Sequence, residues 1–211
     1  MIKKYSLVFI ASLCSFFYGF GQVVNSDLES WTNSTTLTPW TKIENVTQES
    51  TPANVDGGTY SARQVGRPSD LGQTINGIIP GEDYELSFWY KVIVNDGTDA
   101  RIWSYWRNGE TNIDNNDYDT EDAIRGPKNS YLSNNSVNWV QYSITITAPA
   151  TSDNFYLEVR TYSGAIVYWD DFEFNQVATC IQPTDPAGTI SVTLNCGDSD
   201  LNFSTSSSNL Y

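Results

Sequence analysis

The fold is decided by residues 84–92, which read YELSFWYKV. Apolar side chains occupy the even positions of this segment, and polar side chains occupy most of the odd ones. A period of two is typical of a β-strand with one face in the core and one on the surface. Pro80-Gly81 before the segment and Asn95-Asp96-Gly97 after it have the composition of turns. We therefore predict a half-buried strand between two turns.

Further segments along the chain repeat this alternation. The clearest are 142–147, 155–159 and 168–174, and less regular strands are expected at 24–29, 40–48, 58–65, 70–76 and 100–107. No stretch keeps a helical period. About nine short strands separated by turns are typical of a sandwich or a jelly roll. We therefore expect an all-β fold, a β-sandwich or a jelly roll, followed by an incomplete second β module.

The first 21 residues are predicted to be a signal peptide. Two lysines precede an apolar stretch at 5–20. Gly19 and Gly21 are small residues at the two positions that signal peptidase recognises, so cleavage is expected after Gly21. One alternative is a membrane anchor, but the apolar stretch is shorter than the roughly 20 residues that a span needs. The other is a lipoprotein modified at Cys14, but Leu13 stands where such signals have a small residue. We expect a secreted or cell-surface protein with no membrane insertion after cleavage.

Charge and composition exclude several classes of function. The chain has 25 acidic and 11 basic residues, and loss of the first 21 residues removes two lysines and no acid. Such an acidic chain is not expected to bind nucleic acid, whose affinity comes largely from Lys and Arg. Histidine is absent, which excludes Ser-His-Asp and Cys-His catalysis as well as His-ligated zinc. Glycoside hydrolysis by paired carboxylates remains open.

The composition changes after Asn175. We assign residues 1–21 to the signal peptide, 22–177 to the jelly-roll domain, and 178–211 to a linker and a truncated second module. The last segment is too short for a core of its own. Cys180 and Cys196 are an even pair in an exported chain, so a disulfide between them is expected.

Five short motifs follow one another in residues 23–175. They are NSDLE at 25–29, GTYSA at 58–62, IPGEDYELSFWYK at 79–91, WVQY and ITAP between 139 and 149, and YWDDF at 168–172. In this order they resemble carbohydrate-binding jelly rolls of the CenC type, although Ser26 and Leu28 replace the Gly and Phe of the family's first motif. The resemblance implies a galactose-binding-like jelly roll, often a non-catalytic appendage of a secreted enzyme or adhesin. The segment from Cys180 resembles the start of an immunoglobulin-like repeat.

The closing strand contains a candidate metal ligand. Asp170 shares strand parity with Phe172, so its carboxylate is predicted to face inward, where an unpaired charge is costly. The resemblance implies a structural Ca²⁺ between the first and last strands, held by Glu29 and Asp170 with backbone oxygens. Asp171 takes this role if a bulge shifts the register. The alternative is that backbone amides or Arg160 satisfy Asp170.

Aromatic residues are the candidates for a ligand platform, because sugar rings present apolar C–H faces. Alternation places Trp103 and Tyr105 on one face of their strand and Trp106 on the other, so at least one of the three is expected in the core. Trp89 occupies an odd position of the strand at 84–92, whose core side chains occupy the even positions. We therefore expect it to pack under a loop or to line a groove. Tyr118, in the long connection 108–133, is a weaker candidate.

The same connection carries an acidic run. Asp117, Asp119 and Glu121 are similar to a calcium loop but lack the Gly and the distant Glu of the EF-hand pattern. A solvated loop is the simpler interpretation.

Three functional hypotheses follow. The first is a non-catalytic carbohydrate-binding module of a secreted multidomain protein, whose partner is a polysaccharide or glycan. The second is a structural or adhesive β-sandwich without a sugar site, and the third is a carboxylate glycosidase.

Overall fold

The chain divides into two compact units, Met1–Gln176 and Val177–Tyr211. The computed structural model describes residues 23–94, 97–113, 123–126, 130–132, 138–162, 164–177, 191–192 and 203–204. In the second unit it describes one antiparallel pair, β14 (Ser191–Val192) with β15 (Phe203–Ser204). Cys180, Cys196, Tyr118 and the acidic run at 114–122 lie outside the described residues. The disulfide and the immunoglobulin-like start therefore stay predictions.

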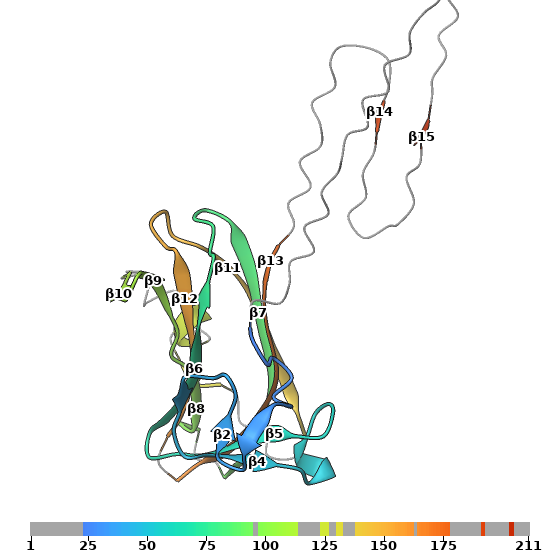
Figure 1. The fold of residues 1–211 in the computed structure, drawn as a ribbon, viewed down its shortest axis with the longest axis vertical. Helices are drawn as coiled ribbons and strands as arrows, with labels where there is room; N and C mark the ends of the chain where they lie inside the picture. Colours follow the sequence, from blue (N-terminus) through green and yellow to red (C-terminus); the bar gives the residue numbers. More distant parts are fainter. Residues whose placement is uncertain are drawn as a thin grey trace, which may run out of the picture. The chain divides into compact units, whose positions relative to one another are not determined.

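The first unit is a sandwich of two antiparallel sheets, which Figure 1 shows packed face to face. One sheet has the order β10-β9-β12-β6-β3, and β8 also pairs with β12. Its strands are β3 (Lys42–Ile43), β6 (Ser69–Asn76), β8 (Ala100–Ile102), β9 (Tyr105–Asn108), β10 (Thr111–Asn112) and β12 (Asn154–Thr161). We call it the six-stranded sheet.

The other sheet has the order β11-β7-β13-β5-β4 and is called the five-stranded sheet. Its strands are β4 (Val46–Glu49), β5 (Ser61–Val65), β7 (Asp83–Val94), β11 (Val140–Thr147) and β13 (Ile166–Gln176). A small pair, β1 (Trp31–Asn33) with β2 (Thr36–Leu37), precedes both sheets. The helical turns in the described residues are two 3₁₀ turns, η1 (Pro52–Asn54) and η2 (Ala123–Arg125), and no helix there is long and apolar enough to cross a membrane.

An aromatic cluster fills the space between the sheets. Phe155 of β12 stacks on Phe174 of β13 with ring centroids 4.5 Å apart, and Trp106 meets Phe155 edge-on at 4.7 Å. The even positions of β7 are buried and its odd positions face outward, as the period-two pattern predicts. This burial confirms the expected all-β sandwich.

Three of the expected strands differ from the structure. The one at 100–107 is divided into β8 and β9, because Trp103 and Ser104 lie outside both strands and the Ser104 amide donates to the Ile124 carbonyl. Residues 24–29 form turns instead of a strand, because Asn25 and Leu28 take left-handed backbone conformations with φ of 51° and 52°. The Asn25 side chain donates to the carbonyls of Ser30 and Thr38 and accepts from the Ser30 amide, so it replaces a strand partner. The expected strand at 40–48 is broken into β3 and β4 by a turn at Asn45, whose φ is 51°.

A bulge in β13 corrects the predicted direction of Asp170. Before the bulge Trp169 pairs with Tyr90 and faces the core, whereas Asp170 pairs with Trp89 on the outer side. The register then shifts between Asp170 and Glu173, and Asp171 sits at φ 45°. Asp170 thus lies on the side opposite to the core that Phe172 fills, although it is fully buried.

Candidate functional site

The outer side of the six-stranded sheet carries aromatic rings interleaved with arginines. Phe155, Leu157 and Val159 of β12 fill the core, so the residues between them point outward. We call the outward set the arginine–aromatic face, and its members are Trp103, Tyr105, Tyr156, Arg101, Arg107, Arg125 and Arg160. All three rings are half-buried.

Guanidinium groups lie over each ring of this face. The Arg125 carbon Cζ is 3.7 Å from the Tyr105 ring centroid, and the Arg107 Cζ is 3.8 Å from that of Tyr156. Three arginines, Arg101, Arg125 and Arg160, approach Trp103 at 4.9, 4.7 and 4.6 Å. Such contacts hold cationic donors at the surface of the rings.

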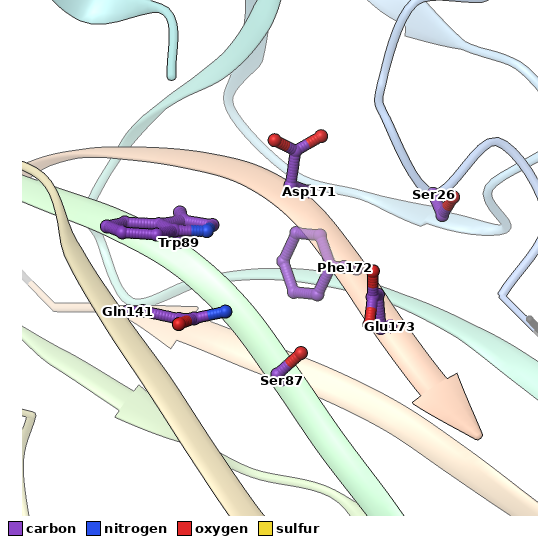
Figure 2. A pocket seen from close by; sticks show the side chains of 7 residues that line it. All are labelled: Ser26, Ser87, Trp89, Gln141, Asp171, Phe172 and Glu173. Atoms are coloured by element: carbon purple, nitrogen blue, oxygen red, sulfur yellow. The ribbon is translucent and has the colours of Figure 1, made fainter. Parts of the chain in front are cut away.

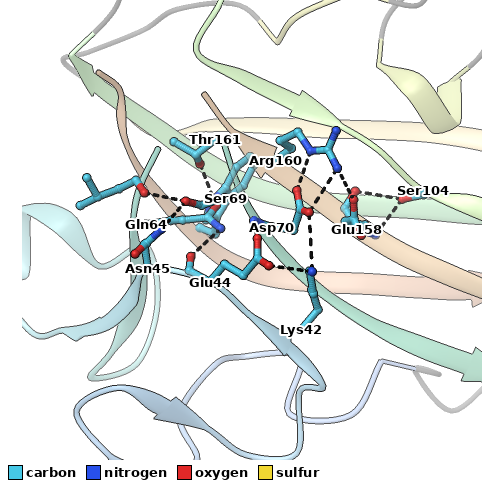
Figure 3. A network of polar contacts seen from close by, with 12 residues as sticks. Lys42, Glu44, Asn45, Gln64, Ser69, Asp70, Ser104, Glu158, Arg160 and Thr161 are labelled. Atoms are coloured by element: carbon cyan, nitrogen blue, oxygen red, sulfur yellow. Dashed lines mark hydrogen bonds and ion pairs between the residues drawn. The ribbon is translucent and has the colours of Figure 1, made fainter. Parts of the chain in front are cut away.

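A polar network extends this face toward β3 and β6 (Figure 3). Arg160 donates two hydrogen bonds to Asp70, from Nε to Oδ1 at 2.5 Å and from Nη2 to Oδ2 at 3.2 Å. Its Nη2 also donates to Glu158 Oε1 at 3.2 Å. Lys42 pairs with Glu44 at 2.7 Å on the same side. Arg160 is therefore committed to this network and does not neutralise Asp170.

Glu158 is the most perturbed acid of the face. Its side chain is nearly buried, and burial together with the charge of Asp70 raises its pKa to about 7, with Arg160 opposing the rise. Burial also raises the pKa of Tyr156, which shares a hydrogen bond with Glu158. Glu158 can consequently donate or accept a proton near neutrality.

Trp106 belongs to the core and not to a ligand platform. Its side chain is 1% exposed and contacts Tyr84, Phe155 and Phe174. The structure thus separates the three aromatic candidates as strand alternation requires, with Trp103 and Tyr105 outside. Sequence reasoning missed Tyr156 and the arginines, although Tyr156 lies on the outward parity of β12 and that signal could have found it.

Trp89 lies on the other sheet and lines a cavity of about 270 Å³. Figure 2 shows its indole beside Gln141 and Ser87, with Asp171 and Glu173 across from it on β13. Of the two predicted positions for Trp89, under a loop or in a groove, the structure shows the groove.

Glu29, Asp170 and Asp171 lie around the turn at Gly57-Gly58. Glu29 Oε1 accepts the amides of Thr59 and Tyr60 at 2.6 and 2.9 Å. A Cβ added at Gly58 would lie 2.2 Å from Glu29 Oε1, and one added at Gly57 would lie 2.9 Å from Asp171 Oδ2. These two carboxylates therefore approach successive residues of one turn, which has room only for glycine at Gly58.

Asp170 is held by backbone donors. Its two carboxylate oxygens accept the amides of Asp56 and Asp171, each at 3.0 Å. Burial and the neighbouring Asp171 charge still raise the pKa of Asp170 to about 7. Within the described residues, no three Asp, Glu, Cys or His side chains are grouped closely enough to hold a metal, so a cation here would also need backbone oxygens.

Comparisons with known proteins identify the class of fold. No protein-family profile matches the chain, and no curated protein matches it. Among solved structures, "Family 16 Carbohydrate Binding Module-2" superposes with a TM-score of 0.51 at 19% identity, covering 72% of this chain and 98% of that one. A putative sugar-binding protein from Bacteroides thetaiotaomicron gives 0.50 at 14% identity, covering 75% and 100%.

A third match is part of a larger protein. The enzymatically active domain of tailspike protein 4 from bacteriophage CBA120 gives a TM-score of 0.52 at 15% identity, covering 74% of this chain but 21% of that one. At these identities the matches define the fold alone. The first unit has the jelly-roll β-sandwich fold of carbohydrate-binding modules.

Proposed function

We propose that the first unit is a non-catalytic carbohydrate-binding module of a secreted or cell-surface multidomain protein. The observation that carries the proposal is the row of half-buried rings on one outer sheet face, Trp103, Tyr105 and Tyr156, on a fold shared with carbohydrate-binding modules. Partly exposed rings with polar donors beside them are the usual composition of a sugar-binding surface. The arginines supply those donors.

The shape of the site favours a polymer over a small molecule. Tyr105 and Tyr156 are paired across β9 and β12, and Arg101 and Arg160 are paired across β8 and β12, so the rings and donors extend along the strands. A polysaccharide lying along β12 would contact several of them at once. Its ring C–H groups would pack on the aromatic edges, and its hydroxyls would accept from the guanidinium groups.

Two features favour binding over glycoside hydrolysis on this face. Both carboxylate oxygens of Asp70 accept hydrogen bonds from Arg160, and the Glu158 side chain is only 5% exposed. A hydrolase needs one carboxyl group open to the leaving oxygen and a second open to the sugar ring or to water. These two acids support the arginines instead.

The experiment is a binding screen with soluble polysaccharides of different backbones, read by affinity electrophoresis and calorimetry. We expect one class to bind the wild type, and Tyr105→Ala with Tyr156→Ala to weaken it about tenfold each, the order of a lost ring contact. Thr145→Ala, at an exposed position of β11 on the opposite sheet, is the control and should bind like the wild type. A folded protein that binds no polysaccharide would favour the structural or adhesive alternative.

We also propose a structural Ca²⁺ beside the turn at Gly57-Gly58. Glu29 and Asp171 are its carboxylate ligands, because Glu29 uses only Oε1 for backbone amides and the Asp171 carboxylate makes no hydrogen bond among the described residues. Asp170 holds the bulge through its two amide contacts. The ion would offset the acidic charges that, with burial, raise the pKa of Asp171.

A further inference from the structure

The cavity beside Trp89 has the composition of a second ligand site. It lies on the outer side of the five-stranded sheet, on the other sheet from the arginine–aromatic face. Its lining residues are Ser26, Ser87, Trp89, Gln141, Asp171, Phe172 and Glu173. One wall is an indole, and all the other lining side chains except Phe172 are polar (Figure 2).

Within the described residues, Trp89 makes no ring or guanidinium contact that explains its position. Its odd place in β7 directs it away from the core, and the strand register puts Gln141 on one side of it and Asp170 on the other. Within the described residues, no aromatic or arginine side chain stacks on its ring. A half-buried tryptophan on an outer sheet face therefore leaves an apolar surface open to the cavity.

The polar groups around the cavity are also unpaired in the described part of the chain. No hydrogen bond or ion pair is formed there by the Ser87 hydroxyl, the Gln141 amide or the Glu173 carboxylate. Ser87 is 5% exposed, and it is one of the polar residues that line the cavity. The arginine–aromatic face differs, because Arg160, Asp70 and Glu158 bind one another.

Charge and size limit the ligand. Two carboxylates and no basic side chain line the cavity, so an anionic ligand is disfavoured. Ligand pockets for drug-sized molecules begin at about 300 Å³, and this cavity of about 270 Å³ lies just below that size. A single ring that carries several hydroxyls fits the volume, the indole wall and the mixture of donors and acceptors.

We propose that this cavity binds one uncharged pyranose ring, stacked on Trp89, with its hydroxyls hydrogen-bonded to Ser87, Gln141 and Glu173. The site is separate from the arginine–aromatic face and does not depend on the polysaccharide site proposed there. A module with both sites would hold a polymer on one sheet and a single sugar residue, such as a chain end or a side branch, on the other.

The test is ligand-observed saturation-transfer NMR on the full chain in metal-free buffer, below its melting temperature, so that both carboxylates of the cavity are free of bound cations. The probes are the methyl glycosides of glucose, galactose, mannose and xylose, and glucuronic acid is the anionic control. We expect at least one neutral glycoside to bind with millimolar affinity and glucuronic acid to give no signal. Absence of a signal from all four neutral glycosides would overturn the proposal.

Variants separate the two sites. Trp89→Ala should remove glycoside binding and Trp89→Phe should restore part of it, whereas Tyr105→Ala should leave it unchanged. Gln141→Ala, at an exposed position of the edge strand β11, should weaken binding several-fold even if Trp89→Ala fails to fold. Glycoside binding that survives Trp89→Phe and Gln141→Ala unchanged, or that disappears in Tyr105→Ala, would place it elsewhere and refute the assignment.

Discussion

Trp89 and Asp170 lie opposite each other in the register of β7 and β13, and the chain bulges immediately after Asp170. The bulge gives two consecutive acidic residues different surroundings. Asp170 is buried and binds the Asp56 amide, whereas Asp171 is half-buried and lines the cavity beside Trp89. One irregularity in the last strand therefore shapes both the acidic turn region and the cavity.

Calcium removal should lower the melting temperature. A ligand that binds only the native state stabilises it by mass action, so EDTA should destabilise the protein and added Ca²⁺ should restore it. Glu29→Gln and Asp171→Asn should each abolish the dependence, and Glu173→Gln, an exposed acid on the same strand, should keep it. Differential scanning calorimetry is the measurement, and coincident curves in EDTA and calcium would show that the ion is absent.

Trp106 and Tyr105 should differ sharply in their effect on stability. Trp106→Ala removes a side chain that is 1% exposed and contacts three other rings, so we expect a loss of about 3–5 kcal/mol in the free energy of unfolding. Tyr105→Ala removes a half-buried ring and its contacts with the Arg125 and Arg107 guanidinium groups, for a loss of about 1 kcal/mol. Urea unfolding measures both, and similar losses would contradict the assignment of Trp106 to the core.

Glu158 should make stability fall as the pH rises toward neutrality. Its folded-state pKa of about 7 exceeds the ordinary value of 4.5, so the folded protein holds a proton that the unfolded chain has released between these values. This contribution is complete below the ordinary value and is lost as the pH passes through about 7. Glu158→Gln should remove this pH-dependent contribution to the free energy of unfolding, which is on the order of 2 kcal/mol.

The measurement for this pH effect is the difference in unfolding free energy between wild type and Glu158→Gln from pH 5 to pH 8. The comparison cancels Asp170, whose pKa is raised in the same direction. The wild type should lose stability relative to the variant across this range. A difference that is constant with pH would show that Glu158 is ionised at pH 5, as its contact with Arg160 alone would favour.

A protein that ends at Gln176 should fold on its own. The first unit ends at this residue, and β13 is paired with β7 along its length up to Gln176. We expect residues 22–176 to unfold in one cooperative transition with the same midpoint as the first unit in the full chain. An unfolded or aggregated product, beside a folded full chain, would show that residues after Gln176 are required.

The sequence by itself determined the regularly alternating strands and the class of fold. The alternation of Tyr84, Leu86, Phe88 and Tyr90 placed these side chains in the core, and the same rule separated Trp106 from Tyr105. Local periodicity is sufficient here because neighbouring side chains of a strand must point to opposite faces, whatever the strand pairs with. The five ordered motifs indicated the jelly roll in another way, through their resemblance to a family of carbohydrate-binding jelly rolls.

Only the tertiary structure decided which outward side chains meet. Tyr105 and Tyr156 are 51 positions apart and become neighbours through the pairing of β9 with β12, and Arg125 reaches Tyr105 from η2. The direction of Asp170 depended on a bulge that strand parity does not contain, because one extra residue reverses every face that follows it. Register between distant strands is set by packing and backbone irregularities, so the sites on both outer faces had to be found in the folded chain.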